Sequence, residues 1–94
     1  MATVVIYSTR VCAYCVRAKQ LLERKGVEYT EIAIDQHPAK RIEMQRLSGR
    51  SSVPQIFIDD QPIGGFTDMW ALEVKGELDV LLGVGADKNE TSEP

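Results

Sequence analysis

The stretch TVVIYSTRVCAYCVRAKQLLERKG, residues 3–26, predicts a strand that leads through a short loop into a helix. Its β-branched and aromatic start, residues 3–7, is typical of a strand that is buried on both faces. From about Ala13 to Lys25 apolar residues recur at helical spacing, and Gly26 suits the left-handed turn that ends a helix. This strand and helix predict the first half of a βαβ unit.

The rest of the chain predicts a small α/β domain. A strand, a helix and a strand with short connections imply a right-handed parallel crossover, and the last two strands form an antiparallel hairpin. Met44 and Leu47 share one face of the second helix. The expected order is βαβαββα, a four-stranded mixed sheet flanked by about three helices on both faces. After Gly26 the predicted elements are a strand over 27–34, a helix that opens within residues 35–38 and ends at Gly49, strands over 55–58 and from 62, a helix from about 67 or 68 to 75 and an amphipathic turn over 78–82.

Size and charge exclude several classes of protein. With 94 residues the chain is long enough for one compact domain and too short for two. A net charge of −3 argues against nucleic acid as a partner, because such partners favour a basic face. No apolar run approaches the roughly 20 residues that cross a bilayer. No basic leader precedes an apolar stretch. We therefore expect a cytoplasmic protein without a membrane partner.

The two cysteines of the chain differ in their predicted surroundings. Cys12 falls just before the helix or in its first turn, where free N–H groups and the helix dipole stabilise a thiolate. Arg10 and Arg17 add positive potential, so we expect the pKa of the Cys12 thiol to lie below its usual value of about 8.5. Cys15 follows three positions later on the same face, but deeper. An exposed attacking sulfur beside a covered one is the asymmetry that disulfide exchange needs.

Three other interpretations of the cysteine pair stay open at this point. A structural disulfide would close so short a loop that it constrains little chain entropy, and such bonds are rare in the cytosol. A zinc site needs four ligands, and His37 is the single histidine of the chain. Two cysteines can also be no more than small buried apolar residues. The position of the CxxC motif between a buried strand and a helix favours the redox pair.

The stretch SSVPQIFID, residues 51–59, predicts a backbone site next to a strand. If the bond before Pro54 is cis, the backbone of Val53 faces outward. Val53 could then offer its N–H and C=O groups to an extended peptide, as an added strand would.

The stretch IGGFTD, residues 63–68, predicts a second binding feature where a strand passes into a helix. The N–H groups of Phe66 and Thr67 could bind a carboxylate, and Asp68 could bind an ammonium group beside it. Together these groups could bind a zwitterion, a molecule that carries both a carboxylate and an ammonium group. A plain tight turn, capped by Thr67 or Asp68, is the simpler alternative.

Taken together, the motifs CAYC, GRSSVPQIFID and IGGFTD at these separations resemble glutaredoxin, a branch of the thioredoxin-like fold. The segments CVRAKQLL, KGVEY and SGRSSVPQIFID are especially similar to the short bacterial dithiol glutaredoxins of the third class. The resemblance covers roughly residues 3–83. It implies a glutaredoxin domain over residues 1–83, followed by a polar tail, residues 84–94, that we expect to be disordered.

The resemblance implies a glutathione-dependent thiol–disulfide oxidoreductase that reduces protein–glutathione mixed disulfides and protein disulfides. Cys12 would attack and carry glutathione as a mixed disulfide, which a second glutathione releases, and Cys15 would resolve dithiol substrates. Glutathione would lie along Val53, with its γ-glutamyl end at Thr67 and Asp68 and its glycyl carboxylate facing Arg41. The glutathione-binding residues implied in this way are Arg10, Tyr14, Arg41, Ser52, Val53, Pro54, Gly65, Phe66, Thr67 and Asp68. The resemblance also implies a monomer whose partners are glutathione and disulfide-containing proteins.

One departure from the family's pattern suggests an alternative function. Ala13 stands where the family usually has proline, and a residue other than proline can permit a [2Fe–2S] cluster held between two monomers by cysteine and glutathione. Cys12 would then be the chain's ligand to the cluster; otherwise we expect no metal. A further alternative is an electron donor that works without glutathione and is served by a thioredoxin-type reductase.

Three smaller departures concern the glutathione groove. Thr9 replaces a common lysine, for which Arg10 could substitute with a different geometry. Ser52 keeps the hydroxyl of the more usual threonine. Phe66 stands in GGFTD where GGCDD is frequent, so we expect a reduced charge there and a contribution from the Phe66 backbone only.

Overall fold

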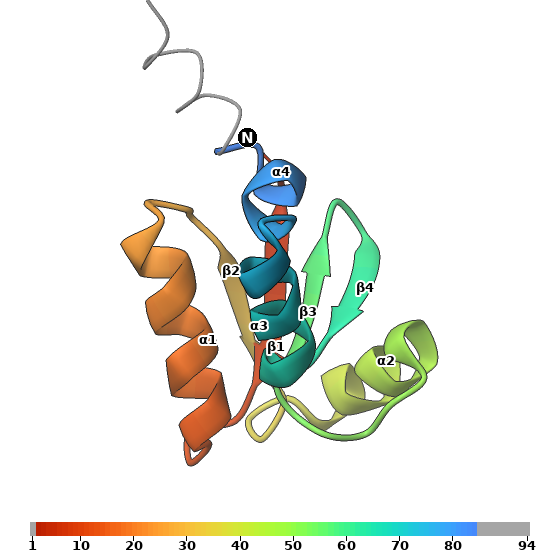
Figure 1. The fold of residues 1–94 in the computed structure, drawn as a ribbon. Coiled ribbons are helices and arrows are strands. Elements are labelled where there is room, and N and C mark those ends of the chain that lie inside the picture. Colours follow the sequence, from red (N-terminus) through yellow and green to blue (C-terminus); the bar gives the residue numbers. More distant parts are fainter. Residues whose placement is uncertain (1, 85–94) are drawn as a thin grey trace, which may run out of the picture.

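A four-stranded mixed sheet forms the centre of the computed structural model, which describes residues 2–84 (Figure 1). The strand order is β2-β1-β3-β4. Strand β1 (Val4–Ser8) pairs in parallel with β2 (Thr30–Ala33) and antiparallel with β3 (Gln55–Ile58). Strand β4 (Gln61–Gly64) completes the antiparallel hairpin at one edge. The predicted mixed sheet and the predicted order of elements are confirmed.

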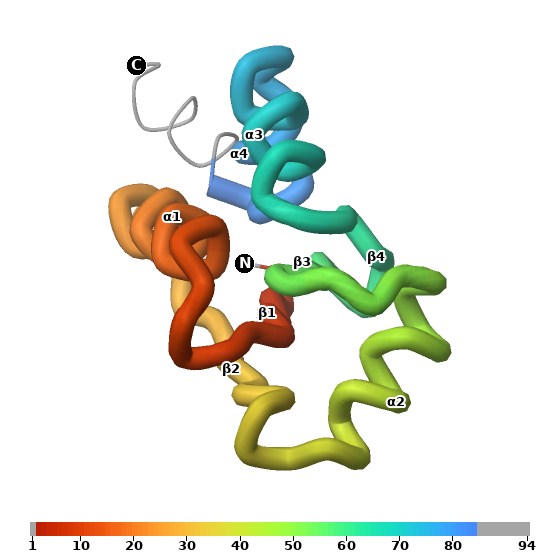
Figure 2. The backbone as a smooth tube through the Cα atoms, turned by 90° about the horizontal axis from the view of Figure 1, so that it is seen from below, coloured from red at the N-terminus to blue at the C-terminus, as the bar shows by residue number. Residues whose placement is uncertain are grey.

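Helices cover both faces of this sheet. Figure 2 shows α1 (Ala13–Arg24) and α3 (Phe66–Lys75) on one side of the strands and α2 (Pro38–Ser48) on the other. The short helix α4 (Leu78–Leu82) follows α3 on the same side as α1. The Lys25 ammonium group, at the end of α1, forms ion pairs of 2.7 Å with Glu73 and 2.6 Å with Asp79. These pairs tie α1 to α3 and α4, so the two long helices hold a fixed spacing on that face.

The core has two layers, because successive residues of β1 point to opposite faces of the sheet. Val4 and Ile6 face the layer under α1, α3 and α4, whereas Tyr7 faces the layer under α2. The larger layer contains Val4, Ile6, Ala18, Leu21, Leu22, Val27, Ile56, Ile58, Met69, Leu78 and Leu82. The smaller layer contains Tyr7, Ile34, Met44 and Phe57. No helix described within residues 2–84 is long and apolar enough to span a membrane.

The strand predicted from residue 27 begins later, at Thr30. Gly26 adopts a left-handed φ of +71°, and the Val27 N–H donates a 3.0 Å hydrogen bond back to the Leu22 carbonyl. This bond, together with that from the Gly26 N–H to Glu23, forms a Schellman-type helix end. Val27 is therefore buried as part of the C-terminal cap of α1. Its N–H group bonds to that helix and is not available to the sheet, so the strand begins later.

Met44 and Leu47 share the face of α2 that lies toward the sheet, as predicted, but the sheet covers them unequally. Met44 is fully buried, but Leu47 is 49% exposed. Leu47 lines a shallow hollow with Val5, Tyr7 and Phe57, at the rim of the smaller core layer. Helix α2 thus contributes Met44 as its single fully buried side chain, and helical spacing alone could not show how little of α2 the sheet covers.

The buried Tyr7 phenol predicts a loss of stability at alkaline pH. Burial and the hydrogen bond that Tyr7 donates to Glu43, at 2.6 Å, raise the pKa of Tyr7 to about 12. An unfolded tyrosine ionises near pH 10, so between pH 10 and about 12 only the unfolded chain loses the proton and the free energy of unfolding falls. We expect Tyr7 to contribute a loss on the order of 2 kcal/mol over this window.

Urea unfolding between pH 8 and 12 measures this effect. The variant Tyr7→Phe should lose less stability over the window than the unaltered chain does. Tyr29 is a useful comparison, because burial and Glu23 raise its pKa to about 12 as well, and Tyr29→Phe should act independently. An unchanged alkaline slope in Tyr7→Phe would contradict the assignment.

Candidate active site

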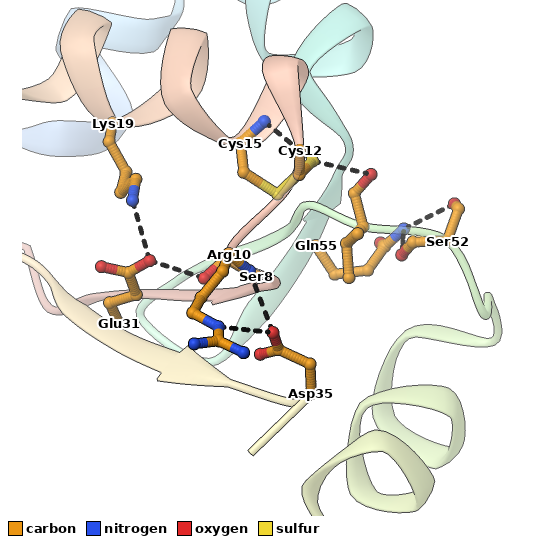
Figure 3. The surroundings of a disulfide bond; sticks show 10 residues. Ser8, Arg10, Cys12, Cys15, Lys19, Glu31, Asp35, Ser52 and Gln55 are labelled. Carbon is orange, nitrogen blue, oxygen red and sulfur yellow. Dashed lines mark hydrogen bonds and ion pairs between the residues drawn. A yellow bond between two sulfur atoms is a disulfide. The ribbon is translucent and has the colours of Figure 1, made fainter. Parts of the chain in front are cut away.

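The cysteine pair lies at the start of α1, with Cys12 as the residue that caps the helix (Figure 3). The two sulfurs form a disulfide, and the Cα atoms of Cys12 and Cys15 are 5.2 Å apart. The Cys15 N–H donates a 3.1 Å hydrogen bond to Cys12 Sγ. Cys12 is partly exposed, whereas Cys15 is fully buried. The predicted difference between an accessible and a covered sulfur is therefore present, and the helix N–H group that would stabilise a Cys12 thiolate already points at Sγ.

The loop before β3 lies beside this sulfur. The Val53–Pro54 bond is cis, and the Val53 carbonyl oxygen is 3.9 Å from Cys12 Sγ. Within residues 2–84, Val53 forms no hydrogen bond with another backbone group, and its carbonyl oxygen contacts only Cys12 Sγ, so both backbone groups of Val53 can pair with an extended ligand. Gln55 holds the loop from below, because its side-chain Nε2 donates to the Ser52 carbonyl at 3.0 Å and to the Ser52 hydroxyl at 3.3 Å.

The N-terminus of α3 forms the opposite side of the groove. Gly65 caps the helix, and its N–H donates a 2.9 Å hydrogen bond to Asp68 Oδ2. Arg50 Nη1 donates to the same oxygen at 2.8 Å. The bond from Arg50, and next that from Gly65, hold the pKa of Asp68 below its usual value. Asp68 is therefore a carboxylate at neutral pH, beside the N–H groups at the positive end of α3.

These parts enclose one groove with a volume of about 360 Å³. Its walls come from the start of α1, the loop before β3 and the start of α3, three segments that are distant in sequence and adjacent in Figure 2. The lining residues are Tyr14, Arg50, Ser52, Val53, Pro54, Gly65, Phe66, Thr67 and Asp68. The fold thus brings together all of the residues predicted to bind glutathione except Arg10 and Arg41.

Arg10 and Arg41 do not line the groove. The Arg10 side chain forms an ion pair with Asp35, 3.5 Å from Nε to Oδ2, and its backbone N–H donates to the same carboxylate (Figure 3). That backbone bond lowers the pKa of Asp35, whose charge offsets the potential that Arg10 was expected to lend to Cys12. Arg41 donates to the Ser51 carbonyl at 3.2 Å, so it supports the loop before β3 from outside.

Two features of the groove were not predicted from the sequence. The first is Arg50, the cation that pairs with Asp68. The one sequence feature that could have indicated this role is its position four residues before Pro54, in the loop that borders the groove. The second feature is the placement of the Phe66 ring, while the expectation that Phe66 serves glutathione through its backbone only stays a prediction. Its ring stacks on Tyr14, with centroids 5.9 Å apart, and on Trp70 at 6.1 Å. Phe66 and Trp70 are four residues apart on α3, so they share a helix face.

A CxxC disulfide at the start of a helix, beside a cis-proline loop and on a four-stranded mixed sheet, defines a thioredoxin-like thiol–disulfide oxidoreductase. Comparison with known proteins gives the particular family. The family model for glutaredoxin matches residues 4–63. The chain belongs to the glutaredoxin family.

The relatives of the chain support this assignment. Glutaredoxin 3 of Escherichia coli K12 is 56% identical over 82 residues, which cover 87% of this chain and 99% of that protein. A glutaredoxin of Pseudomonas aeruginosa is 54% identical and covers the chain to the same extent. These matches confirm the resemblance to the short bacterial glutaredoxins.

Solved structures show the same fold. The solution structure of a glutaredoxin from Brucella melitensis is 50% identical with a TM-score of 0.78, and the match covers 90% of this chain and 92% of that one. A crystal structure of a buckwheat glutaredoxin–glutathione complex has a TM-score of 0.82 at 29% identity, over 87% of this chain and 77% of that one.

Proposed function

We propose that this protein is a glutathione-dependent oxidoreductase that reduces protein–glutathione mixed disulfides and protein disulfides. The observation that carries the proposal is the position of Cys12 Sγ at the N-terminus of α1, 3.9 Å from the carbonyl oxygen of Val53, a residue that lines an open groove. The sulfur that would attack, Cys12 Sγ, therefore lies next to the Val53 backbone, which can hold an extended peptide. The buckwheat relative with glutathione in its structure supports the choice of glutathione as that peptide.

In the route with one cysteine, the Cys12 thiolate attacks the glutathione sulfur of a protein–glutathione disulfide. The S–S bond breaks, the protein thiolate leaves and takes a proton, and Cys12 carries glutathione as a mixed disulfide. A second glutathione thiolate then attacks the bound glutathione sulfur. The products are a protein thiol and oxidised glutathione, and Cys12 returns as a thiolate.

In the route with two cysteines, Cys12 attacks a protein disulfide and forms a mixed disulfide with one of its sulfurs. Cys15 loses its proton and attacks Cys12 Sγ, which releases the second protein thiol and closes the Cys12–Cys15 disulfide. The structure holds this oxidised state. Two glutathione molecules then reduce the disulfide and leave as oxidised glutathione, so two electrons pass from glutathione to the substrate.

Each end of glutathione has a matching group in the groove. The cysteinyl backbone of glutathione would pair with the N–H and C=O groups of Val53, which places its sulfur next to Cys12. The Asp68 carboxylate would bind the γ-glutamyl ammonium group, and the N–H groups at Phe66 and Thr67 would bind the γ-glutamyl carboxylate. Arg50 shares Asp68 with this ammonium group and therefore sets how strongly it is held.

A turnover assay with two reductant systems tests the proposed function. The substrate is the mixed disulfide of glutathione and 2-mercaptoethanol, and the reductant is either glutathione with NADPH and glutathione reductase, or NADPH and thioredoxin reductase alone. We expect turnover that saturates with glutathione in the first system and little turnover in the second. Turnover in the second system only would overturn the proposal and favour the electron donor that works without glutathione.

The [2Fe–2S] alternative rests on Ala13 at the first position of α1. Such a cluster needs four thiolate ligands, and no cluster of three or more metal-binding side chains occurs within residues 2–84. Cys15 is buried, so one chain supplies Cys12 alone. The hypothesis therefore requires two chains and two glutathione thiols. Anaerobic reconstitution with iron, sulfide and glutathione tests it, and a colourless monomer afterwards would exclude it. A cytoplasmic location and a monomeric state in the absence of a cluster stay predictions.

A further inference from the structure

A second groove continues from the proposed glutathione site along the channel between α1 and α3. It has a volume of about 480 Å³ and shares Tyr14, Phe66 and Thr67 with the first groove. Beyond these shared residues its walls extend toward the C-terminal end of α1. The additional lining residues are Arg17, Gln20, Arg24 and Trp70. The second groove therefore adjoins the proposed glutathione site along the Tyr14 and Phe66 rings.

The floor of the second groove is a row of aromatic rings. Tyr14 stacks on Phe66 and Phe66 stacks on Trp70, with interplanar angles of 14° and 26°. The outer rings are not part of the core, because Tyr14 is 53% exposed and Trp70 is 46% exposed. A continuous exposed aromatic surface is characteristic of protein interaction sites, where tryptophan and tyrosine supply much of the binding energy.

The charge around this row is positive. The Arg17 guanidinium lies over the Tyr14 ring, 5.5 Å from its centroid, and Arg24 lines the same wall. Within residues 2–84 neither arginine forms an ion pair, and no carboxylate lines the groove. The neighbouring Glu23 accepts a 2.6 Å hydrogen bond from Tyr29 and lines an adjoining hollow with Gln20 and Arg24, so its negative charge lies at the edge of this surface. In a chain with a net charge of −3, this positive surface is opposite in sign to the whole protein.

We propose that the second groove binds the protein part of the substrate, and that it selects segments in which an apolar side chain is flanked by acidic residues. The proposal rests on the proposed function, since it assumes a protein–glutathione disulfide whose glutathione sulfur is presented to Cys12. Glutathione occupies the Val53 side, so the substrate chain leaves over Tyr14. An apolar side chain then packs on the aromatic row, and carboxylates on either side meet Arg17 and Arg24.

Two glutathionylated peptides of equal length test the proposal. Each carries one cysteine and one leucine; glutamates surround the leucine in one peptide, and lysines surround it in the other. Peptide kcat/KM is measured at 20 mM and 500 mM NaCl, with the mixed disulfide of glutathione and 2-mercaptoethanol as a substrate too small to reach the second groove. At low salt we expect the acidic peptide to be preferred by about tenfold, because its carboxylates would form several exposed charge pairs with the two arginines. At high salt the preference should fall to about twofold.

Two variants separate charge from apolar packing. Arg24→Glu should abolish or reverse the preference for the acidic peptide, and Trp70→Ala should lower kcat/KM for both peptides by about fivefold. Neither variant should change turnover of the small substrate. The matched control is Arg46→Glu on α2, where an exposed arginine of the same charge lies on the other side of the sheet. It should leave the preference between the peptides unchanged.

Distinct outcomes contradict the proposal. Equal kcat/KM for the two peptides in the unaltered chain, or an equal loss in Arg24→Glu and Arg46→Glu, would overturn it. If sedimentation shows a dimer that Trp70→Ala dissociates, the groove is occupied by a second copy of the chain and the proposal is wrong. Failure to turn over the small substrate would instead refute the proposed function.

Discussion

Replacing Cys12 with serine is expected to reduce turnover of a protein–glutathione disulfide by at least about 1,000-fold, because a hydroxyl cannot replace a thiolate as the attacking group. Cys15→Ser should retain turnover of that substrate, since the route with one cysteine uses only Cys12 and glutathione. The same variant should lose the direct reduction of protein disulfides, because no second sulfur remains to release the product. NADPH oxidation coupled to glutathione reductase measures each rate.

The Cys15→Ser variant also allows the acidity of Cys12 to be measured alone. We expect its thiol to titrate below the usual value of about 8.5, because Sγ lies at the N-terminus of α1 and accepts a backbone N–H. Alkylation by iodoacetamide as a function of pH gives this pKa. Thermal unfolding of both variants shows whether the fold is kept. Undiminished activity in Cys12→Ser, or an ordinary thiol pKa, would refute the role of Cys12.

The second large effect is expected from Gly64→Ala at the end of β4. Gly64 has a φ of +112°, a conformation that residues with a side chain rarely adopt. An added Cβ would lie 2.8 Å from Asp68 Cγ and in contact with Oδ2, so the Asp68 side chain would be forced away from Arg50 and Gly65. We expect KM for glutathione to rise about tenfold or more through the loss of this charged contact, and stability to fall by about 2 kcal/mol.

A control and a double variant separate these two effects. Gly76 also has a positive φ, +78°, but a Cβ there would meet nothing within 4 Å. Gly76→Ala should therefore lower stability by about 1 kcal/mol and leave KM for glutathione unchanged. In an Asp68→Ala background, Gly64→Ala should raise KM little further, because both changes remove the same contact. A full additional increase would show that Gly64 does not act through Asp68.

Much of the fold could be predicted because local patterns and tertiary structure agree. The apolar run of β1, the periodic face of α1 and the glycines that end the helices each specify their element without reference to the rest of the chain. The exposure of Leu47 could not be predicted, because helical spacing shows that two residues share a face but not how much of that face a sheet covers. The predicted start of β2 was too early, because the Val27 N–H group bonds to the C-terminal end of α1.

The candidate site was predictable where a motif combines chemistry with a fixed backbone position. Cys12, Val53 and Asp68 are of this kind, and the fold brings their segments together. The ion pair between Arg50 and Asp68 was not predictable, since it joins two loops whose distance only the folded chain sets. The same holds for Arg10, which Asp35 attracts away from the cysteines, and for Phe66, whose ring finds Tyr14 on another helix.

Gln55 has a consequence for how this enzyme can change during evolution. It is a buried residue of β3, and its amide group determines the position of Ser52, three residues earlier in the loop. A buried side chain of the sheet therefore fixes the conformation of this loop. The exposed side chains of the loop are not needed to hold it. Exposed positions such as Ser51 are free to vary and to retune the choice of substrate, while the backbone beside the reactive sulfur stays in place.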